Sequence, residues 1–109
     1  MLELFQTEWC PASKRVRQRL TELSVDYVIR QVPVEREERA VLRAATGSDA
    51  VPALRLENGS AIVGEERIIA FLGEHFVEPF EADAQRQKAA KARRRYLEEE
   101  CTCLELPTR

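Results

Sequence analysis

The sequence predicts an α/β domain with a four-stranded mixed sheet flanked by helices, followed by a C-terminal helix. Short segments that alternate apolar and polar residues are expected strands. Along the chain they are separated by longer segments whose apolar residues recur at helical spacing. An Asn58-Gly59 pair lies between two short apolar runs, which is typical of a β-hairpin and makes the sheet mixed. The chain has 109 residues, of which 44% are hydrophobic, so its length and composition suit a single core.

The first half of the chain reads as a strand, a helix and a second strand. Residues 2–6 alternate apolar and polar side chains, as a strand with one buried face does. Residues 10–24 are the expected helix, because Pro11 suits a first turn in which its missing N–H costs nothing. The apolar residues of this helix fall on one face: Val16, Leu20 and Leu23. Residues 25–33 are the second strand, so a βαβ unit with a right-handed crossover is expected.

The second half adds a helix, the hairpin and another helix. Residues 34–47 are expected to be helical, with acidic residues early and Gly47 as a suitable C-cap. The hairpin lies within residues 48–64. A last helix at residues 65–76 is expected to bury three apolar side chains: Ile68, Leu72 and Phe76. The domain should therefore end near residue 78.

Residues 79–109 differ in composition from residues 1–78. They are rich in Ala, Gln, Arg and Glu and contain few large apolar residues. We expect one exposed helix with a frayed tail, as a second unit of the chain. The basic run 93–95 is followed by the acidic run 98–100, which favours a solvated helix over a surface for nucleic acid.

Composition and charge narrow the class of protein. Charged residues make up 33% of the chain, but the net charge is only −2, which argues against nucleic acid as the main partner. No apolar run approaches a membrane span, and the N-terminus lacks the regions of a signal peptide. We therefore expect a cytoplasmic protein, whose thiols stay reduced. Three cysteines, an odd number, leave room for a reactive thiol rather than a disulfide framework.

The stretch TEWCPAS places Cys10 at the junction between the first strand and the first helix. Unpaired N–H groups and the helix dipole favour an anion there, so the pKa of the thiol should fall and a reactive thiolate is expected. Lys14 adds positive charge one turn away, and the hydroxyl of Ser13 is placed to donate to the sulfur. The plainer interpretation is a small buried apolar residue. Trp9 would shield the thiol, offer a surface to a partner, or be half-buried beside the first strand.

Two further motifs lie where expected strands begin or end. Pro52 directly precedes a strand; a cis Val51–Pro52 bond would turn the chain tightly there, although spacing alone favours a trans bond. Gly64 ends a strand, and Glu65 and Glu66 open the next helix. Acidic residues suit a helix N-terminus for electrostatic reasons alone. The functional interpretation is that these carboxylates and the exposed backbone N–H groups bind a small charged ligand.

Taken together, these motifs resemble a known family. The stretches TEWCPAS, AVPAL and VGEERIIAFL are similar to those of glutaredoxins and of the related N-terminal domain of glutathione S-transferases, over residues 1 to about 76. Both have the thioredoxin fold, which the resemblance therefore implies for this chain. It also implies that Cys10 is the nucleophile. Ser13 replaces the resolving cysteine of dithiol members, so the implied type is monothiol.

The resemblance extends to a site for a small thiol. Val51 and Pro52 match a cis-proline step whose preceding backbone pairs with the cysteinyl part of glutathione. Residues Gly64, Glu65 and Glu66 match the region that holds its γ-glutamyl end. The other candidates for substrate binding surround the cysteine: Trp9, Pro11 and Lys14. Transferases usually have Glu-Ser or Asp-Ser where Gly64 and Glu65 stand, so the implied cofactor is glutathione or another low-molecular-weight thiol.

No metal is expected. Iron–sulfur-carrying monothiol members have Cys-Gly-Phe-Ser, whereas this chain has a stiff proline after Cys10. Cys101 and Cys103 are two close thiols that could bind a soft metal or resolve a mixed disulfide, but a tetrahedral site would also need Cys10 and His75. An uncommitted tail is the favoured interpretation, since chain termini are often poorly ordered.

Two functions compete at this point. The first is an enzyme that exchanges thiols with protein or small-molecule mixed disulfides through Cys10. The second is a non-catalytic thioredoxin-fold module whose C-terminal helix docks a partner or a second copy, because a fold alone never fixes a function. The pKa of the Cys10 thiol distinguishes them. In either case we expect a monomer or a weak homodimer that binds neither nucleic acid nor a membrane.

Overall fold

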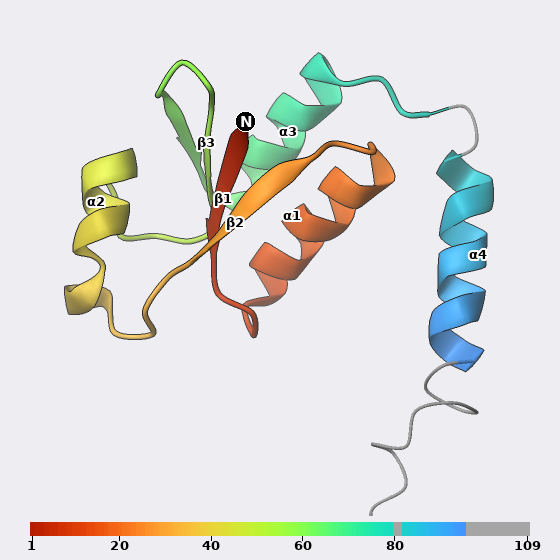
Figure 1. Ribbon diagram of the computed structural model, residues 1–109, viewed down its shortest axis with the longest axis horizontal. Coiled ribbons are helices and arrows are strands. Elements are labelled where there is room, and N and C mark those ends of the chain that lie inside the picture. Colours follow the sequence, from red (N-terminus) through yellow and green to blue (C-terminus); the bar gives the residue numbers. More distant parts are fainter. Residues whose placement is uncertain (80–81, 96–109) are drawn as a thin grey trace, which may run out of the picture. The chain divides into compact units, whose positions relative to one another are not determined.

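In the computed structural model of the protein, residues 1–79 and 82–95 are described (Figure 1). The chain divides into two compact units, Met1–Glu78 and Pro79–Arg109. The second unit contains the helix α4 (Ala82–Arg95). The first unit contains, in chain order, β1 (Leu2–Gln6), α1 (Pro11–Glu22), β2 (Tyr27–Gln31), the 3₁₀ helix η1 (Arg36–Glu38), α2 (Ala40–Thr46), β3 (Ala53–Arg55), β4 (Ala61–Val63) and α3 (Glu65–His75).

The strands form one mixed sheet in the order β2-β1-β3-β4. β1 runs parallel to β2 and antiparallel to β3, and β3 pairs with β4 in an antiparallel hairpin. At the turn of the hairpin, the N–H of Ser60 donates to Oδ1 of Asn58 at 2.9 Å, and Gly59 has a φ of 89°. The mixed sheet and the hairpin that the sequence predicts are therefore confirmed.

Alternation along the strands divides the core between the two faces of the sheet. Leu4 points toward α1 and α3, whereas the next residue, Phe5, points toward α2. The cluster on the first face consists of Leu4, Val16, Leu20, Leu23, Leu54, Ile68 and Leu72. The cluster on the second face consists of Phe5, Val32, Leu42 and Ala53. Figure 1 shows α1 and α3 on one side of the sheet and α2 on the other. Ile68 and Leu72 are buried as expected, and Phe76 is partly buried.

The segment 34–47, expected as one helix, is instead a turn of 3₁₀ helix followed by α2. The break falls at Arg39, whose backbone has φ −89° and ψ 44° and whose side chain is buried. Its guanidinium donates to the carbonyl oxygens of Pro33 and Asp49 at 2.7 and 2.8 Å. These tertiary hydrogen bonds replace the continuous helix that the local sequence favours. Gly47 does end α2, with a left-handed φ of 77°.

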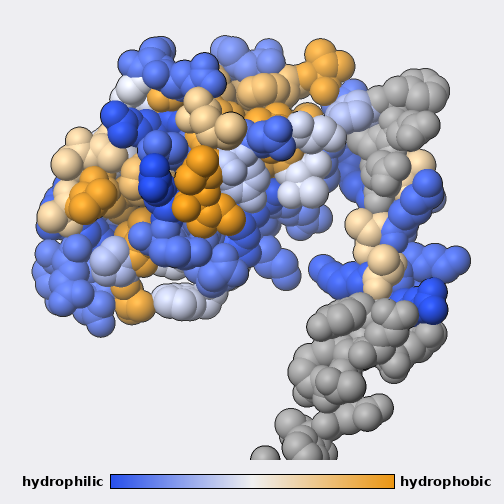
Figure 2. Space-filling view, in the orientation of Figure 1, coloured by the Kyte–Doolittle hydropathy of each residue, from blue (hydrophilic) through white to orange (hydrophobic). Residues whose placement is uncertain are grey.

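The edge strand β2 is largely exposed. The strand expected from the sequence is present, and its apolar residues Val28 and Ile29 are 38% and 41% exposed. Figure 2 shows apolar surface over β2 and α2, set among charged side chains. β2 is the outermost strand of the sheet and pairs only with β1. The helices cover it less completely than they cover the inner strands.

The helix α4, taken by itself, is exposed along its described length. Each of its side chains that the structure describes is exposed or partly exposed, as composition predicts. Its last turn carries Arg93, Arg94 and Arg95. The frayed tail expected beyond it lies outside the described residues. Within the described ranges, no helix combines the length and the apolar character that crossing a membrane requires.

Candidate functional site

Three segments that the sequence singles out meet at one edge of the sheet. The end of β1 leads into the loop that carries Cys10, Pro52 lies directly before β3, and Gly64 directly follows β4. Because β3 is antiparallel to both β1 and β4, these three strand ends share one edge. The N–H of Gly64 donates to the carbonyl oxygen of Pro52 at 2.9 Å, so this hydrogen bond joins the start of β3 to the end of β4.

Cys10 is the N-cap residue of α1. Its backbone is extended, with φ −76° and ψ 119°, and Pro11 takes the first helical position. The Sγ atom accepts a hydrogen bond from the N–H of Ser13 at 3.4 Å, and the carbonyl oxygen accepts from the N–H of Lys14 at 3.0 Å. The sulfur therefore takes the place in which N-cap side chains satisfy the free N–H groups of a helix. The side chain is only partly buried, so part of it faces solvent.

The surroundings of Cys10 lower the pKa of its thiol below the usual value. Partial burial acts in the opposite direction and would raise the pKa by itself. Hydrogen bonds from the N–H and the hydroxyl of Ser13 outweigh this effect, with further donors from the backbone of Ala12 and the hydroxyl of Thr7. The hydrogen-bond donors of the first helical turn thus favour the thiolate form of Cys10.

Ser13 also holds the loop that carries the nucleophile. It is fully buried, and its Oγ atom accepts a hydrogen bond from the N–H of Thr7 at 3.4 Å. The N–H of Cys10 donates to the carbonyl oxygen of Thr7 at 3.3 Å. These two bonds close the turn between β1 and α1. This second role of Ser13 was not visible in the sequence.

A buried polar network ties the same loop to the sheet. Gln6 is fully buried, and its Nε2 atom donates to Oε1 of Glu8 and Oε1 of Gln31, both at 3.1 Å. The guanidinium of Arg17 donates to Oε1 of Gln6 and lies 3.8 Å from the carboxylate of Glu8. Through these contacts Glu8, in the loop before Cys10, is held by side chains of β1 and α1, and Gln6 links them to β2.

Trp9, Pro11 and Lys14 form a solvent-facing rim next to Cys10. Trp9 is 69% exposed, which excludes the half-buried placement considered from the sequence. Pro11 and Lys14 are exposed as well. The rim therefore presents an indole ring and an ammonium group to solvent beside the thiol.

The Val51–Pro52 peptide bond is cis, as the resemblance implies. Pro52 is fully buried, and Val51 packs against the cluster that contains Phe5 and Leu42. Within the described part of the chain, the backbone N–H and carbonyl of Val51 have no hydrogen-bond partner. Both groups lie at the same edge of the sheet as Cys10.

Gly64 and Glu65 begin α3 at this edge. Gly64 has a φ of 100°, a conformation that favours glycine. On α1, Arg15 donates from Nη2 to Oε2 of Glu65 at 2.9 Å and from Nε to Oε1. The hydrogen bond from Arg15 lowers the pKa of the Glu65 carboxyl. Glu66 is exposed and makes no ion pair within the described ranges. No local pattern predicts this pair, because its members are 50 residues apart in the sequence.

The glutaredoxin family model matches residues 2–62, which is more than half of the chain. The chain belongs to the glutaredoxin family. No curated protein matches this glutaredoxin-family chain. Its sheet order, its flanking helices and its structural neighbours make the fold thioredoxin-like, as the sequence motifs imply.

Solved structures of glutathione transferases share the fold of this glutaredoxin-family protein. A glutathione S-transferase domain-containing protein from Marinobacter aquaeolei is 28% identical with a TM-score of 0.61, over 71% of this chain and 40% of that one. A possible transferase from Rhodopseudomonas palustris is 20% identical with a TM-score of 0.61, over 89% and 50%. A transferase homologue from Sulfitobacter, with bound glutathione, is 17% identical with a TM-score of 0.62, over 100% and 58%. The chain therefore spans less than two thirds of the length of each.

The remaining candidates for chemistry in this glutaredoxin-family chain are Cys101, Cys103 and His75. Cys101 and Cys103 are outside the described residues. His75, at the last residue of α3, has Nδ1 3.0 Å from the carbonyl oxygen of Phe71 and stacks on that ring at 4.1 Å. Within residues 1–79 and 82–95, no group of three or more His, Cys, Asp and Glu side chains is placed to hold a metal ion.

Proposed function

We propose that this protein is a monothiol thiol–disulfide exchange enzyme with Cys10 as its nucleophile. The observation that carries the proposal is the position of the Cys10 sulfur at the N-cap of α1, where Ser13 donates to it and the pKa of the thiol is lowered. Ser13 stands where dithiol relatives have their resolving cysteine. Within residues 1–78, Cys10 is the one cysteine of the sequence.

The proposed substrate is a mixed disulfide between a low-molecular-weight thiol and a protein or small molecule. The Cys10 thiolate attacks the sulfur of the small thiol, a new S–S bond forms to Sγ, and the substrate's own S–S bond breaks. The released thiolate takes a proton from water. A second molecule of the small thiol, as its thiolate, then attacks the same sulfur of the Cys10 mixed disulfide. This step releases the small-thiol disulfide and returns Cys10 as a thiolate, so no other oxidant or reductant is needed.

Glutathione is the first small thiol to test. The N–H and carbonyl of Val51, which have no hydrogen-bond partner among the described residues, suit the amide backbone of its cysteinyl residue. The carboxylate of Glu65 is already bound by Arg15, which leaves Glu66 as the exposed carboxylate for the ammonium of the γ-glutamyl end. The bound glutathione of the Sulfitobacter homologue supports this choice.

The test is exchange activity in matched cysteine variants. Cys10→Ser should abolish reduction of a glutathione mixed disulfide by glutathione, because no nucleophile remains in the site. The double variant C101S/C103S should keep the activity, since the proposed cycle needs only Cys10. Turnover that survives in C10S contradicts the proposal.

An inactive wild-type protein would favour the second interpretation, a binding module. In that case Cys10 should alkylate only near the pKa of a free cysteine, about 8.5. The exposed helix α4 would then be the first surface to test for a partner or a second copy of the chain.

A further inference from the structure

Arg39 is a charged residue that the fold nearly buries, with 8% of it exposed. Its guanidinium donates three hydrogen bonds, all to backbone carbonyl oxygens: Pro33 at 2.7 Å, Asp49 at 2.8 Å and Val34 at 3.0 Å. Burying a charged group costs free energy unless its hydrogen-bond donors are satisfied. Moving any of the three carbonyl oxygens away from the guanidinium would therefore be unfavourable. Two acceptors lie in the loop after β2 and the third lies in the loop before β3. Arg39 therefore bridges two loops that are separate in the sequence.

The second of these loops carries the Val51–Pro52 step. On one side of Val51, the carbonyl oxygen of Asp49 accepts from Arg39. On the other side, the carbonyl oxygen of Pro52 accepts from the N–H of Gly64 at 2.9 Å. Val51 lies between these two anchors, and its own N–H and carbonyl are unused among the described residues. The position of the Val51 N–H and carbonyl is therefore set by the hydrogen bonds of Asp49 and Pro52.

We propose that Arg39 is a positioning residue for thiol exchange: by holding the carbonyl of Asp49, it fixes the backbone of Val51 where the small-thiol half of the substrate binds. The inference rests on the proposed function, in which the N–H and carbonyl of Val51 pair with that thiol. None of the hydrogen bonds of Arg39 reaches the loop that carries Cys10. Loss of the guanidinium should therefore weaken substrate binding and leave the thiolate unchanged.

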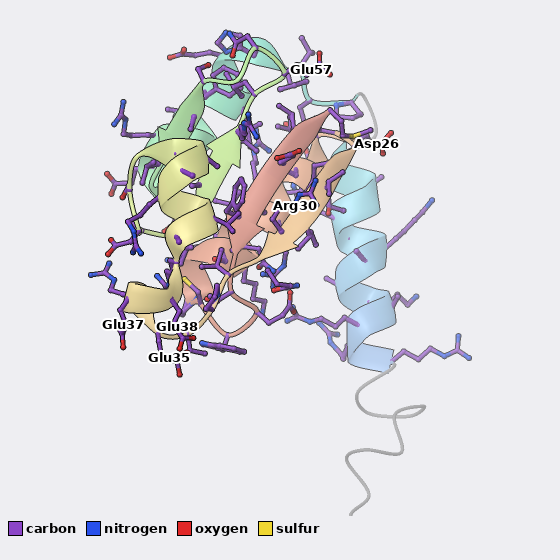
Figure 3. The ribbon with its side chains drawn as sticks, turned by 60° about the vertical axis from the view of Figure 1, so that its left-hand side comes forward. Asp26, Arg30, Glu35, Glu37, Glu38 and Glu57 are labelled. Atoms are coloured by element: carbon purple, nitrogen blue, oxygen red, sulfur yellow. The ribbon has the colours of Figure 1, made fainter. Side chains whose placement is uncertain are left out.

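The surroundings of Arg39 allow this residue to be replaced without a clash. Its side chain lines a cavity of about 460 Å³ between β2 and α2, together with apolar residues that include Phe5 and Leu42. A smaller side chain would meet open space on that side. Glu35 and Glu37 project outward from the η1 end of the molecule (Figure 3), so they do not act as buried counter-ions for the guanidinium.

The experiment compares Arg39, the N-cap residue of α2, with Arg43, which lies one turn later within α2. Arg43 also donates to two backbone carbonyls, those of Arg36 and Glu37 at 2.9 and 3.2 Å, but it is exposed and does not reach Asp49. The variants R39Q, R39K and R43Q are made in the C101S/C103S background. KM and kcat are measured for the mixed disulfide of glutathione and β-mercaptoethanol, together with the rate of Cys10 alkylation as a function of pH.

R39Q should raise KM about fivefold or more, the effect of one weakened hydrogen bond, while kcat changes little. R39K keeps the charge but cannot span the same carbonyls, so its KM should fall between those of R39Q and wild type. The alkylation profile of Cys10 should be the same in all variants, and R43Q should match wild type in every measurement.

Several results would overturn the inference. The first is a KM of R39Q that equals that of wild type. The second is a KM that R43Q raises as much as R39Q does. The third is an altered Cys10 alkylation profile in R39Q, which would place the effect of the substitution at Cys10. If R39Q does not fold, R39K decides; if neither folds, Arg39 is a structural residue and the inference is wrong. A wild-type protein without exchange activity refutes the proposed function and the inference with it, whereas an active wild type with a normal R39Q refutes the inference alone.

Discussion

Cys10 depends on Ser13 through two donors, the backbone N–H and the hydroxyl. Ser13→Ala keeps the first and removes the second, so the pKa of the Cys10 thiol should rise toward its usual value and alkylation at neutral pH should slow. The N–H of Thr7 would lose its buried acceptor as well. That loss should lower the free energy of unfolding by about 1–3 kcal/mol. Alkylation rates as a function of pH and denaturant unfolding measure the two effects.

The matched control is Ser60→Ala in the hairpin. The hydroxyl of Ser60 is exposed and donates to Asn58, far along the sequence from the thiol. All variants need the C101S/C103S background so that only Cys10 is alkylated. If S13A and S60A give the same pH profile, the hydroxyl of Ser13 contributes nothing to the thiolate.

The lowered pKa of Cys10 also links stability to pH. The unfolded chain holds the thiol proton up to about pH 8.5, whereas the folded protein releases it at lower pH. Between the folded-state pKa and that value, the unfolded state binds more protons, so the free energy of unfolding should rise with pH. This contribution is fully present above the unfolded pKa and is lost as pH falls through the folded pKa.

The measurement is urea unfolding of the C101S/C103S protein and of the same protein with C10S, at a series of pH values under reducing conditions. The difference in stability between the two should grow across this window in favour of the protein that keeps Cys10. A difference that stays constant with pH would mean that the thiol titrates alike in the folded and unfolded chains.

Among the elements, the start of α3 depends on a conformation that only glycine adopts readily. Gly64 has φ 100° and ψ 141°, whereas Gly73 lies inside α3, and a Cβ atom at either would meet nothing within 4 Å. Gly64→Ala should therefore lower the free energy of unfolding by about 1–3 kcal/mol through the backbone alone. Gly73→Ala should raise it by about 1 kcal/mol, because alanine favours a helix. Thermal unfolding of the two variants should show shifts of opposite sign, and a G64A protein as stable as wild type would contradict this account.

The elements that could be predicted are those whose signals are local. Alternation at Leu4 and Phe5 gives one residue to each face of the sheet, so β1 could be predicted from five residues. Asn58 and Gly59 specify a turn by their own conformational preferences. Cys10 could be placed at a helix mouth because the proline after it suits only the first turn. In each case the cause lies within a few residues of its effect.

The elements that could not be predicted depend on partners that are distant in the sequence. The local sequence of 34–47 favours a helix, and the break at Arg39 arises from carbonyl acceptors in two other loops. Likewise, Arg15 and Glu65 are ordinary surface charges until the fold brings α1 and α3 together. Such contacts form only when the folded chain brings distant residues together, so no local pattern in the sequence predicts them.

At the scale of the whole molecule, the first unit holds everything that the proposed chemistry requires. Both core clusters lie within Met1–Glu78, and so do Cys10, the Val51–Pro52 step and the start of α3. The transferases that share the fold are longer, since the chain spans 40% of the Marinobacter protein and 50% of the Rhodopseudomonas protein. If the first unit is sufficient, its chemistry should not depend on any residue after 78.

The prediction is that a protein ended after Glu78 folds cooperatively and keeps the exchange activity and the Cys10 alkylation profile of the full chain. The comparison is the full chain with C101S/C103S, which has the same single thiol. Circular dichroism during heating tests the fold, and turnover of the glutathione mixed disulfide tests the function. A shortened protein that folds but loses turnover would mean that residues 79–109 complete the site, in contradiction to the single-thiol mechanism of the first unit. A shortened protein that keeps turnover would leave α4 free for another task, because the catalytic cycle would then have no use for it.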